Sequence, residues 1–112
     1  MQPIAIGCLR LTPSPQFSRL YGGTLRLMAA THGYFLMSVI EFDHSGDAQT
    51  HNALMADYIR AAKAEAVLAA GLEHLAGGEH AITELCVLVT PEQTYPRGHH
   101  WPSHVPNAGS VR

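Results

Sequence analysis

The chain has 112 residues, of which 46% are hydrophobic and only 14% are charged. This length suits one domain with a single hydrophobic core. The 7 Lys and Arg residues against 9 Asp and Glu residues exclude the basic stripe of a stand-alone nucleic-acid-binding protein, so we expect at most weak DNA binding. The low charge leaves little polar surface, and we expect a homo-oligomer or a complex with a protein partner.

The two cysteines, Cys8 and Cys86, lie inside apolar runs, which indicates buried, reduced thiols rather than a disulfide framework. The apolar stretches are all shorter than the roughly 18 residues of a membrane-spanning helix. The N-terminus lacks the basic and apolar regions of a signal peptide. We therefore expect a cytoplasmic protein with no membrane association.

The first predicted elements are a strand and a helix. Residues 4–11 are apolar at positions that would face both sides of a sheet, which predicts a central strand. Apolar residues from there to Gly33 recur at helical spacing, with Leu20, Leu27 and Met28 on the expected buried face. Pro15 fits the first helical position and Gly33 fits the end of the helix.

The next strand is predicted at residues 34–42, because this run is almost continuously apolar and rich in aromatic and β-branched residues. A polar loop follows at 43–47. A second helix is predicted over residues 49–64. Its expected buried stripe consists of Leu54, Met55, Tyr58, Ile59 and Ala62.

The last predicted elements are a strand at 66–70, a turn at 72–78, a short helix at 79–83 and a strand at 85–89. Strands that alternate with helices indicate an α/β fold with a parallel sheet. We predict three layers, with about four strands in the order 2-1-3-4 and helices on both faces. This domain would span residues 1–90, followed by an irregular Pro/His-rich tail at 91–112.

The candidate site follows from this topology, because ligands of parallel sheets bind beyond the carboxyl ends of the strands. Arg10 and Thr12 are two residues apart on a strand, so both side chains point the same way and Arg10 could hold an anion beside Thr12. Ordinary polar loops would carry similar residues, and that alternative stays open. The segments expected at this edge are Arg10 with Thr12, Asp43 with Ser45, Glu73 with His74, and Thr90 with Glu92.

Three histidines of the tail, His99, His100 and His104, are weak candidates for metal ligands beside Trp101. Neighbouring histidines point in different directions, and closed metal sites usually draw on distant ligands as well. We therefore expect no metal, no cofactor, and a solvated or partner-contacting tail. For the remaining candidates, we expect His51 and His80 at the surface and Met28, Met37 and Met55 in the core.

Three segments resemble one family. Residues 7–12, Gly-Cys-Leu-Arg-Leu-Thr, resemble the first strand of serine recombinases, usually written Tyr-x-Arg-Val-Ser. Asp43–Gly46 is similar to the family's Asp-x-x-Ser-Gly loop, one residue shorter, and residues 66–76 resemble its strand and turn ending in Leu-Asp-Arg-Leu-(Ala/Gly)-Arg. The resemblance covers about residues 3–90 and is closest to small stand-alone resolvase-like proteins. It implies the resolvase catalytic-domain fold, with Thr12 at the position of the nucleophilic Ser and Arg10 at that of a phosphate-binding Arg.

The departures from the family concern its charges. Its arginines stabilise the charge that develops on the DNA phosphate during attack. The two turn arginines correspond to His74 and Gly77, and the loop arginine after Ser45 is absent. His74 is mostly neutral at neutral pH and lacks the bidentate fork of Arg. Loss of one such donor lowers a rate about 100- to 1000-fold, so Thr12 and Arg10 would be vestigial.

We therefore expect a pseudoenzyme, a non-catalytic resolvase-like domain that serves as a protein-interaction or self-assembly module. One alternative is a working recombinase in DNA recombination, with Thr12 as nucleophile and Arg10 as phosphate clamp. A second alternative is a small-molecule binder at the strand-end crevice, although the sequence has no glycine-rich phosphate loop of the usual forms.

Overall fold

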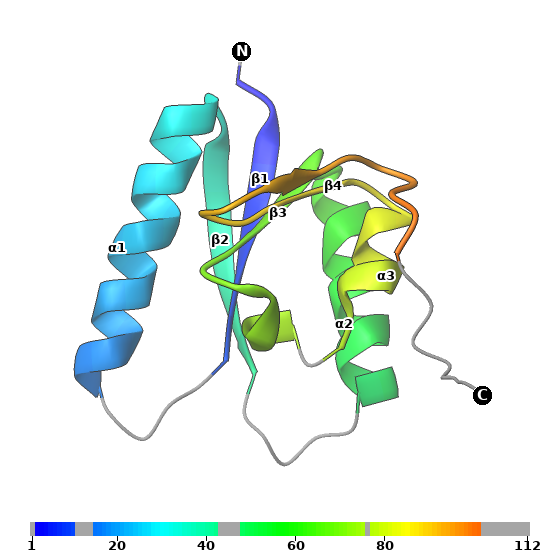
Figure 1. The fold of residues 1–112 in the computed structure, drawn as a ribbon, viewed down its shortest axis with the longest axis horizontal. Helices are drawn as coiled ribbons and strands as arrows, with labels where there is room; N and C mark the ends of the chain where they lie inside the picture. Colours follow the sequence, from blue (N-terminus) through cyan, green and yellow to red (C-terminus); the bar gives the residue numbers. More distant parts are fainter. Residues whose placement is uncertain (1, 11–14, 43–47, 76, 102–112) are drawn as a thin grey trace.

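The computed structural model describes residues 2–10, 15–42, 48–75 and 77–101. Within them, one sheet has the strand order β2-β1-β3-β4-β5, in which β1 to β4 are parallel and β5 is antiparallel to β4. Helices lie between the successive parallel strands β1 to β4, and a short turn joins β4 to β5 (Figure 1). The elements are β1 (Ile4–Arg10), α1 (Pro15–His32), β2 (Phe35–Phe42), α2 (Ala48–Ala62), β3 (Ala66–Ala69), the 3₁₀ helix η1 (Leu72–Leu75), α3 (Glu79–Thr83), β4 (Val87–Val89) and β5 (Thr94–Tyr95).

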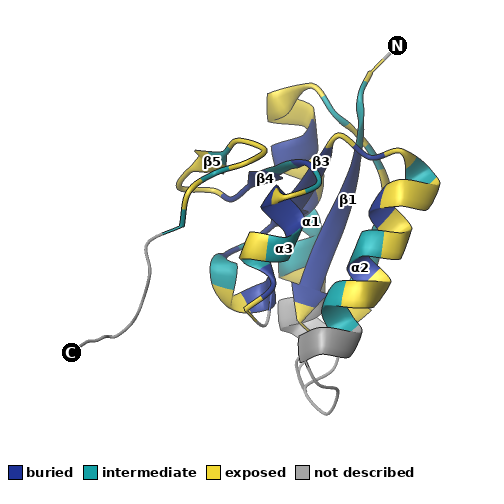
Figure 2. Ribbon diagram, turned by 90° about the vertical axis from the view of Figure 1, so that its right-hand side faces the viewer, coloured by how far each residue is buried: buried dark blue, intermediate teal, exposed yellow. Residues whose placement is uncertain are grey.

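The sheet is the middle of three layers, with α1 on one face and α2 and α3 on the other (Figure 1). The central strands β1 and β3 are buried on both faces, which explains why their residues are apolar at nearly every position (Figure 2). The α/β class, the helices on both faces and the order β2-β1-β3-β4 confirm the prediction from the sequence. None of the described helices is both long and apolar enough to cross a membrane.

The sequence predicted about four strands, and the sheet has five, because it continues after Val89. The Thr90 hydroxyl donates to the Gln93 carbonyl oxygen over 2.9 Å and accepts from the Gln93 N–H over 3.2 Å, which closes a tight turn. This turn folds Thr94–Tyr95 back along β4 as β5. The segment after Pro91, expected to be irregular, therefore contributes a strand to the sheet.

Both long helices end at a residue in the left-handed region. At the end of α1 this is Gly33, with φ 76°, as the sequence indicated. At the end of α2 it is Lys63, with φ 54°, so the helix ends at Ala62 rather than at the predicted Ala64. Residues other than Gly rarely adopt this backbone conformation, so the sequence gave no sign that α2 ends before Lys63.

The fourth strand is two residues shorter than predicted. The N–H groups of Leu85 and Cys86 donate to the Ile82 carbonyl oxygen over 2.9 and 3.0 Å, which caps the end of α3. Because these groups are used in the cap, pairing with β3 begins only at Val87.

The helices bury narrower stripes than their apolar residues suggested. Leu20 and Leu27 of α1 are 61% and 69% exposed, and Leu54 and Tyr58 of α2 are 44% and 45% exposed. Met37 of β2, expected in the core, is 52% exposed. All five residues were predicted to be buried, but their side chains lie on the surface.

Gly7 lies in the middle of β1, under α1. A Cβ atom at this position would lie 2.8 Å from Leu25 Cδ1 and 3.1 Å from Val39 Cγ2. Leu25 is fully buried, so its side chain has no empty space into which to move. The missing side chain of Gly7 therefore sets how closely α1 packs on the sheet.

Replacing Gly7 with Ala should lower the free energy of unfolding by about 1–3 kcal/mol, because the added methyl group overpacks the core. Gly23→Ala is the matched control: it lies within α1 with no atom within 4 Å of a Cβ, and should raise stability by about 0.5–1 kcal/mol. Urea denaturation followed by circular dichroism measures both. A Gly7→Ala protein as stable as the wild type would contradict this account of the packing.

Candidate functional site

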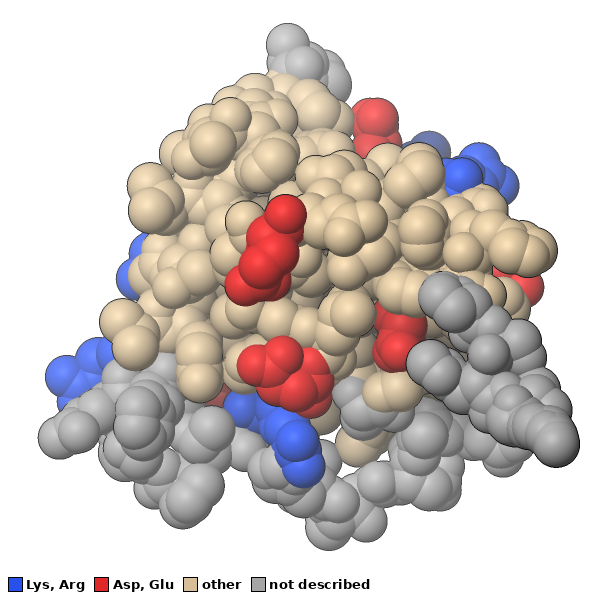
Figure 3. Space-filling model, viewed as in Figure 1, with Lys and Arg blue, Asp and Glu red and all other residues tan. Residues whose placement is uncertain are grey.

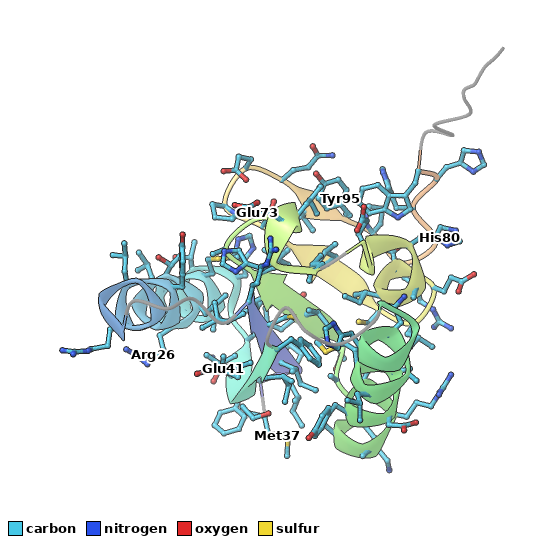
Figure 4. The ribbon with its side chains drawn as sticks, turned by 90° about the horizontal axis from the view of Figure 1, so that it is seen from below. Arg26, Met37, Glu41, Glu73, His80 and Tyr95 are labelled. Carbon is cyan, nitrogen blue, oxygen red and sulfur yellow. The ribbon has the colours of Figure 1, made fainter. Side chains whose placement is uncertain are left out.

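The carboxyl ends of β1 to β4 meet at one edge of the sheet, and Figure 4 looks onto this edge. β1 ends here at Arg10, and η1 follows the end of β3. The topology therefore brings together the described residues of the segments that the sequence placed here. Arg10, Glu73, His74 and Thr90 are described, whereas Thr12, Asp43 and Ser45 lie outside the described residues.

His74 makes the contacts that connect the elements at this edge. Its side chain is buried, at 5% exposure, and its Nδ1 accepts a hydrogen bond from the backbone N–H of Arg10 over 3.1 Å. Its ring contacts Tyr21 of α1 edge-on, with the centroids 4.5 Å apart. The Cys8 thiol donates weakly to the His74 carbonyl oxygen over 3.7 Å. His74 therefore ties the end of β1 to η1 and to α1.

The contact with Arg10 also sets the protonation state of His74. A ring nitrogen that accepts a hydrogen bond carries no proton, so the imidazole is neutral and its proton lies on Nε2. Burial lowers the pKa of His74 and outweighs the Glu73 carboxylate, which raises it, and the Arg10 guanidinium lowers it further. A neutral, buried ring with Nδ1 occupied is a structural part and does not replace the positive charge of an arginine.

The described charges at this edge are of mixed sign. Arg10 is exposed at the end of β1, and Glu73 is exposed on η1 with its carboxylate folded over the backbone of Gly71. On the face drawn in Figure 3, Lys and Arg side chains form separate groups, and acidic side chains lie between them. Attack on a phosphodiester needs several cations around one phosphate. The described residues show no such convergence.

Thr90, the fourth segment expected at this edge, has a structural role. It is 4% exposed, and its hydroxyl makes both hydrogen bonds of the turn to Gln93. Glu92 within that turn is exposed. The segment after β4 therefore shapes the β4–β5 turn and offers no hydroxyl to a ligand.

The histidines of the C-terminal segment do not form a metal site in the part of the chain that the structure describes, where no group of three or more His, Cys, Asp or Glu could hold an ion. His99 packs edge-on against Trp101, with the centroids 4.6 Å apart, and His100 is exposed. The Trp101 indole N–H donates to Thr83 Oγ1 over 2.8 Å. His104 lies outside the described residues.

His51 was expected at the surface, and the structure corrects this. Its ring stacks on Phe42 with the centroids 4.7 Å apart, and its Nδ1 is buried without a hydrogen-bond partner among the described residues. His51 therefore packs α2 against the end of β2. His80, expected at the surface, is exposed.

The two thiols are unsuited to nucleophilic chemistry. Cys8 and Cys86 are free and buried, as predicted. Burial raises the pKa of Cys8 to about 12 and that of Cys86 to about 11. Because the thiolate is the nucleophile, both cysteines are unreactive in the folded protein.

Analysis of the sequence missed an exposed apolar surface along β2. Asn52 and Ala56 of α2 face α3, whereas Leu54 and Tyr58 lie on the other flank of the helix, the flank nearer β2. On β2 itself Phe35 and Met37 are 54% and 52% exposed, and Figure 4 shows Met37 at the open edge of the sheet. We call this the β2-edge surface; it consists of Phe35, Met37, Leu54 and Tyr58.

A groove runs along the other side of β2, between this strand and α1. One part, of about 480 Å³, is lined by Arg26, Leu36 and Val39 among others. The adjoining part, of about 270 Å³, is lined by Arg19, Arg26, Val39 and Glu41 among others. Figure 4 shows Arg26 and Glu41 on this side of the sheet edge. Both sides of β2 therefore offer space to another chain.

The stability of the protein should depend on pH through His74. Folding lowers the pKa of His74, so below about pH 6.5 the unfolded chain binds a proton that the folded chain does not. The free energy of unfolding therefore decreases as the pH is lowered from about 6.5, until the pH is below the folded-state pKa. His74→Asn keeps an oxygen that can accept from Arg10 but does not titrate. Urea denaturation at a series of pH values should show a shallower decrease for His74→Asn, and equal slopes would contradict the assignment.

Both thiols should react slowly with a chromogenic disulfide reagent in the native protein at mildly alkaline pH, and rapidly once urea unfolds the chain. The reason is that burial keeps Cys8 and Cys86 protonated, with pKa values of about 12 and about 11. Cys8→Ala and Cys86→Ala assign the two phases. Rapid labelling of a folded cysteine would show that its site is open.

No protein-family model, no curated protein and no solved structure matches the chain.

Proposed function

We propose that this chain is a non-catalytic α/β domain that binds another protein chain through the β2-edge surface. The observation that carries the proposal is the exposure of four large apolar side chains, between 44% and 54% each, along one open edge of the sheet. Covering one half-exposed side chain of this size contributes about 1 kcal/mol. Several of them along one edge are typical of an interaction site rather than of scattered surface residues.

The two edges of the sheet differ in a way that supports this proposal. β5 is two residues long and is flanked by Pro91 and Pro96, which resembles the short, proline-bounded edges that prevent strand pairing. β2 is eight residues long, and Glu41 is its only charged residue. A long apolar edge strand is an open template for another chain. One edge is closed to association and the other is open.

The domain would be a resolvase-like protein that has lost its chemistry. The order of its elements and Arg10 at the end of β1 support that lineage. His74, at a turn-arginine position of the resembled family, is neutral and occupied by Arg10 N–H. A net charge of -2 and the mixed charges at the strand ends favour a protein partner over DNA. Two free thiols suit a reducing compartment such as the cytoplasm.

The proposal predicts that polar substitutions on the β2-edge surface weaken association without unfolding the domain. Leu54→Gln combined with Tyr58→Gln should raise the concentration at which the protein associates by at least about tenfold, or about 1.4 kcal/mol. The matched control is Leu20→Gln with Leu27→Gln, which removes exposed apolar surface from α1 and should leave association unchanged. Sedimentation equilibrium measures self-association, and pull-down from a lysate measures other partners.

A chain that remains monomeric at every concentration and retains no protein in a pull-down would contradict the proposed function. Equal weakening by the α1 control would contradict the assignment to the β2-edge surface.

A further inference from the structure

We propose that the partner is a second copy of this chain, bound by antiparallel pairing of β2 with β2 of that copy. This inference rests on the proposed function and names its partner. Two copies related by a twofold axis perpendicular to the sheet present the same edge to each other, and their β2 strands then run antiparallel. A continuous sheet across both copies results.

The backbone of β2 is suited to this pairing. β2 pairs with β1 along one side only and ends the sheet in the strand order, so its outer N–H and C=O groups have no strand partner among the described residues. Antiparallel pairing satisfies such groups whatever the side chains are. Figure 4 shows this edge open between α1 and α2. The helices therefore leave room for a further strand.

The side chains select one register. Opposite residues in an antiparallel pair must lie on the same face of the sheet. With the twofold axis at Val39, Phe35 lies opposite Phe42 of the second copy, and both belong to the face covered by α2, since they pair with Ile4 and Arg10 in β1. Leu36 lies opposite Glu41, and Met37, the extra residue of β2 relative to β1, is accommodated at the open edge as a β-bulge. The whole of Phe35–Phe42 is then paired.

This register is complementary in charge. Leu36 lines the groove together with Arg26. Glu41 of the second copy, opposite Leu36, therefore reaches the groove beside Arg26, and the twofold axis creates the same contact a second time. The twofold pairing thus brings Glu41 of one copy to Arg26 of the other, in addition to the Arg19, Arg26 and Glu41 of a single copy that line the adjoining part of the groove. Such pairs fix register and orientation more than they add affinity.

The buried area fits a reversible dimer. Each of the four side chains of the β2-edge surface has about 100 Å² left to cover, so two copies cover about 800 Å² of apolar side chain. Leu54 and Tyr58 take part because the α2 helices of the two copies lie on the same side of the joined sheet. With the strand backbones added, the interface approaches the lower limit of about 1,200 Å² for specific complexes. We expect a dimer that dissociates on dilution.

The decisive experiment exchanges the two charges between chains. Glu41→Arg alone places two arginines together, and Arg26→Glu alone places two glutamates together, so each variant should dimerise at least about tenfold more weakly than the wild type. A mixture of the two variants restores both opposite-charge contacts, but only in a heterodimer. Sedimentation equilibrium of the mixture should return association to within about threefold of the wild type, and high salt should reduce this recovery.

Glu92→Arg and Arg97→Glu are the matched controls, because both residues are exposed near β5, away from the β2 edge. They should dimerise like the wild type, alone and mixed. As a second measurement, amide hydrogen exchange within Phe35–Phe42 should slow as concentration rises, because the outer N–H groups of β2 become bonded.

The outcomes separate this inference from the proposed function. If the wild type dimerises, the α2 variants weaken it and the charge-exchanged mixture does not recover, antiparallel β2 pairing is overturned while the interaction surface stands. If the wild type stays monomeric but captures another protein through the β2-edge surface, the second copy is overturned as partner. If nothing is bound, both proposals fail.

Discussion

The fold depends on enclosing β1. This strand has β2 and β3 on its two sides, α1 above one face and α2 with α3 above the other, so every direction around it is occupied. Gly7 lets α1 approach, and His74 secures the end of the strand through the Arg10 N–H. A strand enclosed on four sides can carry no alternation of polar and apolar residues.

The helices that cover β1 on both faces leave β2 partly exposed. The same α1 and α2 that cover the central strands reach β2 only on their flanks, so its two faces stay partly exposed and its outer backbone faces outward. The opposite edge is closed by the short β5 and by the aromatic contacts of Tyr95 and Trp101. The proposed association would therefore use one side of the molecule, which favours a closed pair of copies over an open chain of them.

Much of the fold could be predicted from the sequence because its signals are local. Apolar runs mark the strands, and Gly33 marks the end of α1. The left-handed Lys63 and the cap at Cys86 depend on hydrogen bonds to residues already placed by folding, and no composition signal announces them. β5 exists because the Thr90 turn returns the chain to β4, a tertiary effect. Helical spacing identifies an apolar face but not its buried width, which is why Leu54 and Leu27 were misplaced.

The candidate site shows the same division. The rule that parallel strands end at one edge brought Arg10 and His74 together correctly. The role of His74 depends on a single hydrogen bond, in which its Nδ1 accepts from the backbone N–H of Arg10. His74 stands at the position of an arginine in the resembled family, but it is a neutral hydrogen-bond acceptor. The chemistry therefore follows from a contact between residues 64 positions apart in the chain, which sequence patterns do not encode.

The contacts of Trp101 give the protein a built-in optical probe. This residue is the only tryptophan of the chain, and it stacks on Tyr95 while its indole N–H is held by Thr83. Its emission therefore reports whether the C-terminal segment is docked on α3, and not only whether the whole domain is folded. If the Trp101 emission changes during unfolding before the helical circular dichroism does, the C-terminal segment undocks as a separate event, at a place distant from the β2 edge.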